Sequence, residues 1–325
     1  MKSLFWEDGR FYRANLHAHS TCSDGSLEPS ELFAAYREMG YQILALTDHE
    51  TLWPHSRLST PDMLVLEGFE MSFAAAGRST PTRQTCHITM LAKVPNLSQE
   101  DGNPAFLPPK EGEKQGMRRV FSVDGINDVL SFASQEGYFP ILSHPYWSLQ
   151  KPQDFVRLAC LGGVEVYNHL CALAGSRDCS AAALDAFLSE GKPLLPIAAD
   201  DCHGNLHAGD PECDRFGGFE MICATALTYP AVIEALEAGQ AYASTGPLFT
   251  QLGTEDGRLH FVCSAVREAR LLSDTRPISA RLYDPAGRIT YGSFDIPPQA
   301  GWVRLEITDT EGHTAWTRAY ADREL

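Results

Sequence analysis

Basic residues are scarce in this chain of 325 residues. Lys and Arg total 26 against 42 Asp and Glu, which gives a formal net charge of −16. A nucleic-acid duplex or an anionic membrane would need a broad basic face, so this balance argues against both as partners. A small anionic substrate remains compatible, because bound metal ions can reverse the sign of the charge locally.

Long apolar runs and paired cysteines are missing as well. No stretch approaches the ~20 apolar residues of a membrane span, and the segment Met1 to Arg13 has charges where a signal peptide has a continuous apolar core. The nine cysteines are scattered, without a C-x-x-C pair. We therefore expect reduced thiols in a cytoplasmic protein that does not bind membranes.

Strand and helix signals alternate from about Ala14 to about Gly246, which is typical of a parallel α/β sheet or barrel. A first helix is predicted to begin at Pro29 and to end at Gly40. Further helices are predicted over 126–136, 152–161, 180–190 and 230–238, and a strand over 163–168 brings the barrel count to about seven.

One segment interrupts this alternation. Residues 96–116 are rich in Pro, Gly, Glu and Lys and have little apolar periodicity. The composition predicts a long loop or flap, with Arg118 and Arg119 at its exit.

The pattern changes again near residue 247. Val303, Leu305 and Ile307 alternate with polar residues at a period of two, which is typical of strands that have one buried face. We therefore expect a barrel over 1–247 and a small antiparallel β domain over 248–325.

Six strand-like runs lead into residues that bind metals in proteins. In chain order these residues are His17, His19 and Asp24, then His49, then Glu70, then His87, then His144, and last Asp201 and His203. One histidine after an apolar run means little. Six such runs predict one shared metal site, because the C-terminal ends of barrel strands meet at one end of the barrel.

Two pairs of these ligands have the spacing of side chains on one face of a strand. His17 and His19 are two residues apart, and Asp201 and His203 repeat the device. Neutral imidazole suits Zn, Mn or Fe, and carboxylates suit harder ions and can bridge between two of them. We expect two or three divalent ions of these kinds as cofactors.

Four motifs in this order resemble those of the PHP (polymerase and histidinol phosphatase) family. They are His17-Ala18-His19-Ser20-Thr21-Cys22-Ser23-Asp24-Gly25, Thr47-Asp48-His49, Ser143-His144-Pro145 and Asp201-Cys202-His203-Gly204. The resemblance covers about Ala14 to Pro247 and implies a distorted (β/α)7 TIM-like barrel. The Ser-Thr-Gly-Pro run at 244–247 and the β-rich tail are also similar to metallohydrolases of the carbaryl-hydrolase type.

The resemblance implies three metal positions. The first would be held by His17, His19, Glu70 and Asp201, the second by Glu70 as a bridge with His87 and His144, and the third by Asp24, His49 and His203. Histidinol phosphatases of the family usually carry a histidine where this chain has Asp24. The Ser-Asp-Gly version is closer to members that act on nucleotides and short oligonucleotides.

A charge count favours an anionic substrate. Three divalent ions would bring +6 and the three carboxylates −3, which leaves an excess that a phosphate and a bridging hydroxide could offset. The sequence thus predicts a phosphoesterase that acts on a nucleotide or sugar phosphate by attack of a metal-bridging hydroxide. Asp48 would orient a ligand rather than act as a general acid.

Other residues are assigned by their place next to the motifs. Substrate contacts are expected from Arg118, Arg119, Tyr146 and Asn168, with Trp147 and Glu165 beside them, whereas Lys110 and Arg215 are expected as solvated charges. Glu67, Asp200 and Cys202 should point away from the site by strand alternation. The histidines outside the motifs are expected to be surface or packing residues: His55, His169, His207, His260 and His313.

Two alternatives remain open at this stage. The same metals could serve a carboxylester, amide or carbamate hydrolase, as the similarity of the C-terminal region suggests. The barrel could also be a non-catalytic binding module, which the intact ligand set disfavours.

Overall fold

The computed structural model describes residues 1–74, 84–95, 119–175, 181–204, 209–275 and 280–325. The loop expected over 96–116, together with Lys110, Arg118 and His207, lies outside these residues. Within them, no helix is long and apolar enough to cross a membrane.

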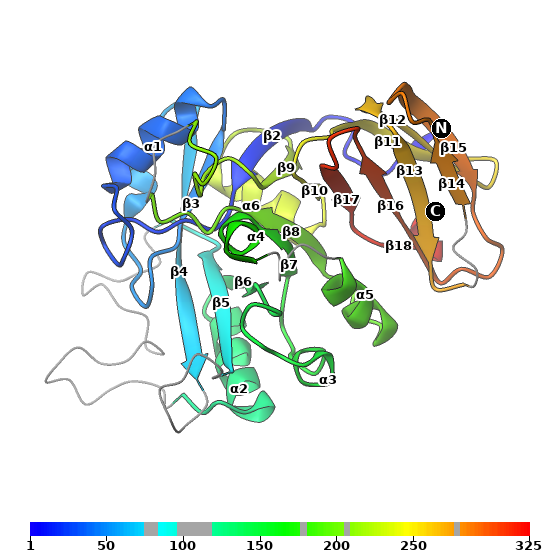
Figure 1. Cartoon of the computed structure of the whole chain (residues 1–325). Helices are drawn as coiled ribbons and strands as arrows, with labels where there is room; N and C mark the ends of the chain where they lie inside the picture. Colours follow the sequence, from blue (N-terminus) through cyan, green and yellow to red (C-terminus); the bar gives the residue numbers. More distant parts are fainter. Residues whose placement is uncertain (75–83, 96–118, 176–180, 205–208, 276–279) are drawn as a thin grey trace, which may run out of the picture.

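Seven strands lie side by side in chain order (Figure 1). They are β2 (Arg10–Asn15), β3 (Ile43–Leu46), β4 (Leu64–Ala74), β5 (Thr85–Ala92), β6 (Tyr138–Ser143), β7 (Gly163–Asn168) and β8 (Leu195–Ala199). The run has two ends, and they meet just beyond β2 and β8, where Ala18 and Cys202 form a parallel bridge. Here the His19 amide donates to the Cys202 carbonyl at 2.8 Å, and the Asp201 amide donates to that of His17 at 3.0 Å.

The sheet differs from the expected parallel arrangement at β5. β2, β3 and β4 are parallel to one another, as are β6, β7 and β8, but β5 is antiparallel to both β4 and β6. The connection from β4 to β5 is short in sequence, since β4 ends at Ala74 and β5 begins at Thr85, whereas a parallel crossover needs about a dozen residues or more. The small separation in sequence therefore favours an antiparallel pair.

A helix is present at or near each predicted position, and His169–Gly175 forms a further helix that was not predicted. The helices are α1 (Pro29–Glu38), α2 (Val123–Gln135), α3 (Pro152–Phe155), α4 (His169–Gly175), α5 (Ala182–Ser189) and α6 (Tyr229–Glu237), with a 3-10 turn η1 (His55–Leu58). α1 begins with a capping box at Glu28 and Glu31, and Gly40 follows its end at a φ of 79°. α3 is shorter than the helix predicted over 152–161: it ends at Phe155, and Cys160 has a φ of 57°, outside the helical region.

The large sheet continues from β2 into the C-terminal part of the chain. The additional strands are β9 (Phe219–Ala224), β10 (Ala241–Ser244), β17 (Thr314–Thr317), β16 (Trp302–Thr308), β13 (Glu268–Ser273) and β14 (Ala280–Tyr283), with β18 (Tyr320–Ala321) on β16 and a 3-10 turn η2 (Asp322–Glu324) after it. A second, four-stranded antiparallel sheet contains β1 (Lys2–Ser3), β11 (Phe249–Glu255), β12 (Arg258–Val266) and β15 (Ile289–Asp295). The C-terminal part is thus antiparallel β structure.

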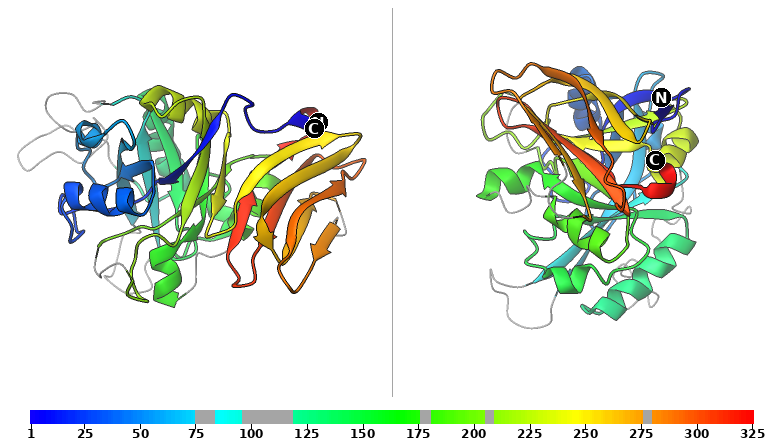
Figure 2. Two further views of the ribbon diagram at one scale, coloured as in Figure 1. Left: turned by 90° about the horizontal axis from the view of Figure 1, so that it is seen from above. Right: turned by 90° about the vertical axis from the view of Figure 1, so that its right-hand side faces the viewer.

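Strand pairing and buried polar contacts tie this part to the rest of the chain. β1 pairs with β11, so both ends of the chain lie on the C-terminal part (Figure 2). β10 pairs with β17 across residue 247. The buried guanidinium of Arg304 on β16 donates to both carboxylate oxygens of Asp185 on α5, each at 2.9 Å, and to Glu306 at 2.6 Å.

Candidate metal centre

The segments that directly follow β2 and β8 lie side by side. They carry the pairs His17 and His19, and Asp201 and His203, toward the same space. The bridge between Ala18 and Cys202 fixes these segments in register, with His17 and His19 on one and Asp201 on the other. Asp201 has a φ of 54°, a left-handed conformation that non-glycine residues seldom adopt. Such strain concentrates at functional sites, where the surrounding structure maintains it.

The other ligands come from the neighbouring strand ends. Glu70 lies on β4, and a parallel bridge places His49 opposite it. His87 on β5 pairs with Ser72 on β4 and with Ser143 on β6. The next residue, His144, leaves β6 with a φ of 27°.

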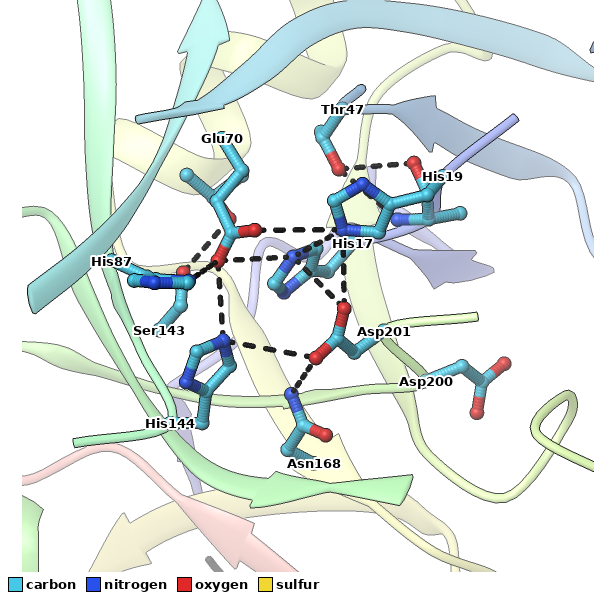
Figure 3. A network of polar contacts seen from close by, with 12 residues as sticks. His17, His19, Thr47, Glu70, His87, Ser143, His144, Asn168, Asp200 and Asp201 are labelled. Carbon is cyan, nitrogen blue, oxygen red and sulfur yellow. Dashed lines mark hydrogen bonds and ion pairs between the residues drawn. The ribbon is translucent and has the colours of Figure 1, made fainter. Parts of the chain in front are cut away.

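The Glu70 carboxylate lies at the centre of the cluster and is buried (Figure 3). Its Oε1 is 3.1 Å from Nδ1 of His87, 3.1 Å from Nε2 of His144 and 3.5 Å from Nε2 of His17. Its Oε2 is 3.0 Å from Nδ1 of His49 and 3.5 Å from Nε2 of His19. One carboxylate therefore faces five imidazoles, as a bridging ligand would.

Asp201 faces the same space from the opposite side. Its Oδ1 is 3.1 Å from Nε2 of His19 and 3.4 Å from Nε2 of His17, and its Oδ2 is 3.7 Å from Nε2 of His144. The Nε2 atoms of His17 and His19 are themselves 3.2 Å apart. These ring nitrogens converge on a common point.

Asp24 forms the outer part of the cluster. Its carboxylate is 3.4 Å from Nε2 of His203, 3.6 Å from Nε2 of His49 and 3.8 Å from Nδ1 of His19. The Asp24 side chain is 57% exposed, whereas that of His17 is 1% exposed. The cluster therefore opens to solvent on the Asp24 side.

The structure brings all nine sequence-predicted ligands together. Their donor atoms form overlapping groups: His17, His19 and Glu70; His17, His144 and Asp201; Glu70, His87 and His144; and His19, Asp24, His49 and His203. Within each group the atoms lie within 4.8 Å of one another. Six imidazoles and three carboxylates at such separations are a donor set for divalent metal ions.

Charges within the cluster shift several pKa values. Burial lowers the pKa of His17, but Asp201, Glu70 and Glu165 outweigh burial and raise it well above its usual range. Burial also opposes the rise at His144, where contact with Glu70 raises the pKa to about 9. At His19 burial dominates and the pKa is lowered. Without a cation, protons on the rings supply the positive charge that the carboxylates need.

Glu165 holds His17 from behind the cluster. Its Oε1 is 2.7 Å from Nδ1 of His17, and its Oε2 accepts hydrogen bonds from the His144 amide at 2.8 Å and from the Asn168 side chain at 3.0 Å. Glu165 therefore supports His17 and His144 and is not the substrate contact that the sequence predicts. A buried glutamate among apolar neighbours on a strand indicates such a supporting role.

Asn168 also lies beneath the cluster. Its side chain is fully buried, and its Nδ2 donates to Asp201 Oδ2 at 3.2 Å as well as to Glu165. Its Oδ1 accepts from the Cys171 amide at 3.0 Å. These bonds occupy its polar atoms with protein partners, so the expected substrate contact gives way to a role in positioning Asp201.

Asp48 supports the turn that carries Asp24. Its Oδ1 accepts from the amide of Ser20 at 2.7 Å and from the hydroxyl of Ser23 at 2.8 Å. Burial raises the pKa of Asp48, but the nearby His55 ring and hydrogen bonds from Ser20 outweigh burial and lower it. The carboxylate orients the turn without facing the nine ligands.

Tyr146, from which a substrate contact is expected, does not face the cluster. Its ring packs against the core, 6.0 Å from the ring of Phe155. The next residue, Trp147, has its ring 5.0 Å from His144 and 6.0 Å from His87, and it is 45% exposed. Trp147 is therefore the aromatic residue that stands over the cluster.

Arg119 is the predicted substrate cation that the structure describes. Its NH1 donates to Glu50 Oε1 at 2.7 Å and to the Ser72 carbonyl at 2.9 Å, and its NH2 pairs with Glu50 Oε2. Glu50 follows His49, and the Ser72 hydroxyl is 3.4 Å from His87 Nε2. The guanidinium is thus held next to the cluster. Arg215, expected as a solvated charge, is buried instead.

Residues expected to point away do so. Asp200 accepts from the Tyr36 hydroxyl at 2.7 Å and from the amides of Phe216, Gly217 and Gly218. The Glu67 carboxylate accepts from the Ser56 amide at 3.1 Å. Cys202 is buried in an apolar cluster, and burial raises the pKa of its thiol.

Two of the other histidines are held by polar partners outside the cluster. His169 contacts the Tyr167 hydroxyl and the Cys213 carbonyl at 2.9 and 3.0 Å, and His313 pairs with Asp309. His55 instead lies buried beside Asp48. It therefore differs from a plain surface or packing residue.

Comparisons with known proteins give distant structural likenesses. Neither a protein-family model nor a curated protein matches the chain. Among solved structures, a two-domain protein from Bacteroides vulgatus containing a predicted PHP-like metal-dependent phosphoesterase is similar over 98% of each chain, at 16% identity and a TM-score of 0.46.

Two further solved structures are similar over about three fifths of this chain. A protein from Bifidobacterium adolescentis assigned as a metal-dependent phosphoesterase covers 61% of this chain and 91% of its own, at 16% identity and a TM-score of 0.38. An amidohydrolase from Chromobacterium violaceum, with bound sulfate and no metal, covers 62% and 93%, at 19% identity and a TM-score of 0.36. Two of the three names thus mention a metal-dependent phosphoesterase, and one of these two calls it PHP-like.

Proposed function

We propose that this protein is a metal-dependent hydrolase that releases phosphate from a small phosphorylated molecule, a nucleotide or a sugar phosphate. The observation that carries the proposal is the Glu70 carboxylate facing five imidazoles, with Asp201, Asp24 and His203 completing the nine donors. We further propose that β2 to β8 form a PHP-type barrel and that this end of it is the active site.

The donor set fits divalent ions. His17 Nδ1 is directed to Glu165, and its Nε2 faces the oxygens of Glu70 and Asp201 at 3.5 and 3.4 Å. Two buried carboxylates beside one ring nitrogen need a positive charge, which a ring proton supplies without a metal and a bound cation would supply in its place. The buried Nδ1 of His19 lacks a hydrogen-bond partner among the described residues and faces Asp24. A cation at each place would satisfy these groups.

Bound divalent ions would supply the Lewis acidity that lowers the pKa of water and neutralises charge on a phosphoryl group. The protein's own residues hold the ligands in place. Glu165 fixes the His17 ring, Asn168 fixes Asp201, and Asp48 fixes the turn that carries Asp24. Such supporting bonds set the orientation and basicity of metal ligands.

The substrate would enter on the Asp24 side, where the cluster is exposed. Arg119 next to His87 and Trp147 over His144 border the cluster. A guanidinium and an aromatic ring suit a phosphate and a planar group, respectively. This arrangement supports a nucleotide over a purely aliphatic phosphate.

A second candidate keeps the metals and changes the bond to a carboxylester, amide or carbamate. The favouring observation is that Glu50 already neutralises Arg119 through two contacts. A neutral substrate would require no guanidinium at the rim.

Phosphate release tests the first candidate against the second. Wild type, His49→Ala and the control His313→Ala would be loaded with Mn or Zn and given nucleoside mono- and bisphosphates, sugar phosphates and histidinol phosphate. We expect release by wild type and the control, and a loss of about 100-fold or more in His49→Ala. Turnover of nitrophenyl acetate without any phosphate release, in a protein shown to contain its metals, would favour the second candidate and overturn the first.

A further inference from the structure

A second group of metal-binding side chains lies beside the nine-ligand cluster. Cys22 is in the turn after His19, Asp48 follows β3, and His55 begins η1. One donor atom from each of the three lies within 4.8 Å of the others. The group shares no residue with the nine ligands, and it contains a sulfur where the nine contain none.

His55 is directed into this group from the buried side. The residue is 5% exposed, and its Nε2 is 3.6 Å from Asp48 Oδ2. That nitrogen is buried and has no hydrogen-bond partner in the described structure. A buried polar nitrogen without a partner is uncommon in native proteins and indicates a bound ligand or ion.

The Asp48 carboxylate has spare hydrogen-bonding capacity on the oxygen that faces His55. Its Oδ1 is occupied by the Ser20 amide, the Ser20 hydroxyl and the Ser23 hydroxyl at 2.7, 3.0 and 2.8 Å. Its Oδ2 accepts only from the Ser20 hydroxyl, at 2.8 Å, among the hydrogen bonds of the described residues. A second lone pair of Oδ2 therefore remains for a ligand between Asp48 and His55.

We propose that Cys22, Asp48 and His55 bind a thiophilic divalent cation such as Zn²⁺, in a site separate from the nine-ligand cluster. Thiolate, imidazole and carboxylate are the three protein ligand types of zinc, and three of them leave a fourth position for solvent. On binding, the Cys22 thiol loses its proton to solvent and the sulfur forms the bond to the ion.

Such an ion would have a structural consequence. It would link η1 to the turn 20–24 through Asp48, which already bonds Ser20 and Ser23 in that turn. Asp24 lies at the end of this turn and belongs to the outer group of the main cluster. The ion would therefore hold the most exposed of the nine ligands in place.

Cobalt substitution distinguishes this site from the main cluster. A thiolate bound to Co²⁺ gives a near-ultraviolet charge-transfer band, which nitrogen and oxygen ligands do not give. We expect the band in full-length wild type loaded with Co²⁺, in His49→Ala, and in Cys160→Ser, which removes an exposed cysteine elsewhere. We expect its loss in Cys22→Ser and, independently, in His55→Ala, with folding of each variant checked by circular dichroism.

A wild-type protein without the band, or a band that survives both Cys22→Ser and His55→Ala, would overturn the site. The readout needs no substrate and no turnover. A failure of the proposed hydrolase activity therefore leaves this test intact, and a failure of this test leaves the activity proposal intact.

Discussion

Glu165 lies 2.7 Å from Nδ1 of His17 and thereby decides which nitrogen of that ring faces the nine-residue cluster. With Nδ1–H directed to the carboxylate, Nε2 is left as the ligand atom. The other oxygen of Glu165 accepts from the His144 amide and the Asn168 side chain. One buried carboxylate thus orients residues from three strand ends.

Glu165→Gln should weaken metal binding without creating a cavity, because glutamine has nearly the size of glutamate. The glutamine oxygen can still accept from His17, but its NH2 group would then face two donors, the His144 amide and Asn168 Nδ2. We expect a loss of roughly 10- to 100-fold in metal affinity, measured by competition with a chelating dye. Glu67→Gln, a buried glutamate on β4 directed away from the cluster, is the matched control. Equal affinities in the two variants would contradict the supporting role.

Chelation should destabilise the folded protein. An ion that binds only the folded state adds about 2.7 kcal/mol at a free concentration of 100 times its Kd. We therefore expect Tm to fall on dialysis against a chelator and to recover with Mn or Zn. His49→Ala should show a smaller shift because one of its sites lacks a ligand. A Tm that is independent of metal in wild type would contradict binding at the cluster.

Trp147→Ala should alter substrate preference more than chemistry. The ring stands 5.0 Å from that of His144 and is partly exposed, so it can stack on a planar group of a bound substrate. We expect KM to rise about 2- to 10-fold for a nucleotide and to change little for glycerol phosphate, with kcat largely kept. Trp147→Phe should restore most of the nucleotide KM. A similar rise for both substrates would mean that the ring contributes only packing.

The sequence was sufficient to predict that the nine candidate ligands lie together, because strand ends can be read from apolar runs. His17 and His19, or Asp201 and His203, have a spacing that is meaningful only on extended chain. The structure brings these residues together with Glu70 at the expected end of the sheet. Strand alternation also distinguished Glu70 from Glu67 as the candidate ligand, because it places the two side chains on opposite faces of the strand.

Strand direction and side-chain orientation were harder to predict where they depend on tertiary contacts. β5 runs antiparallel because its connection to β4 is short, although the residues of the strand itself resemble those of its neighbours. Tyr146 and Trp147 are adjacent aromatics, and only the packing of Tyr146 against Phe155 determines which of them reaches the rim. Likewise, the buried partners of Asn168 are distant in sequence, so its role in positioning Asp201 could not be read from the chain.

A buried glutamate outside the site should make stability depend on pH. Glu220 on β9 is fully buried, and its Oε1 accepts from the Ala198 amide of β8 at 2.8 Å. Burial raises the pKa of this carboxyl well above its usual value, although the hydrogen bond from Ala198 lowers it somewhat. The folded protein therefore keeps a proton that the unfolded chain releases above about pH 4.3.

The sign of the effect follows from this difference. Below the unfolded pKa both states are protonated and Glu220 contributes no pH dependence. As the pH rises from there to the raised folded pKa, the free energy of unfolding falls, by at most about 1.4 kcal/mol per pH unit. Glu220→Gln does not titrate and its oxygen can still accept from Ala198, so urea unfolding should show a weaker decline with pH than wild type. The exposed Glu234→Gln serves as control and should follow wild type, and a Glu220→Gln profile parallel to both would show that Glu220 is ionised in the fold.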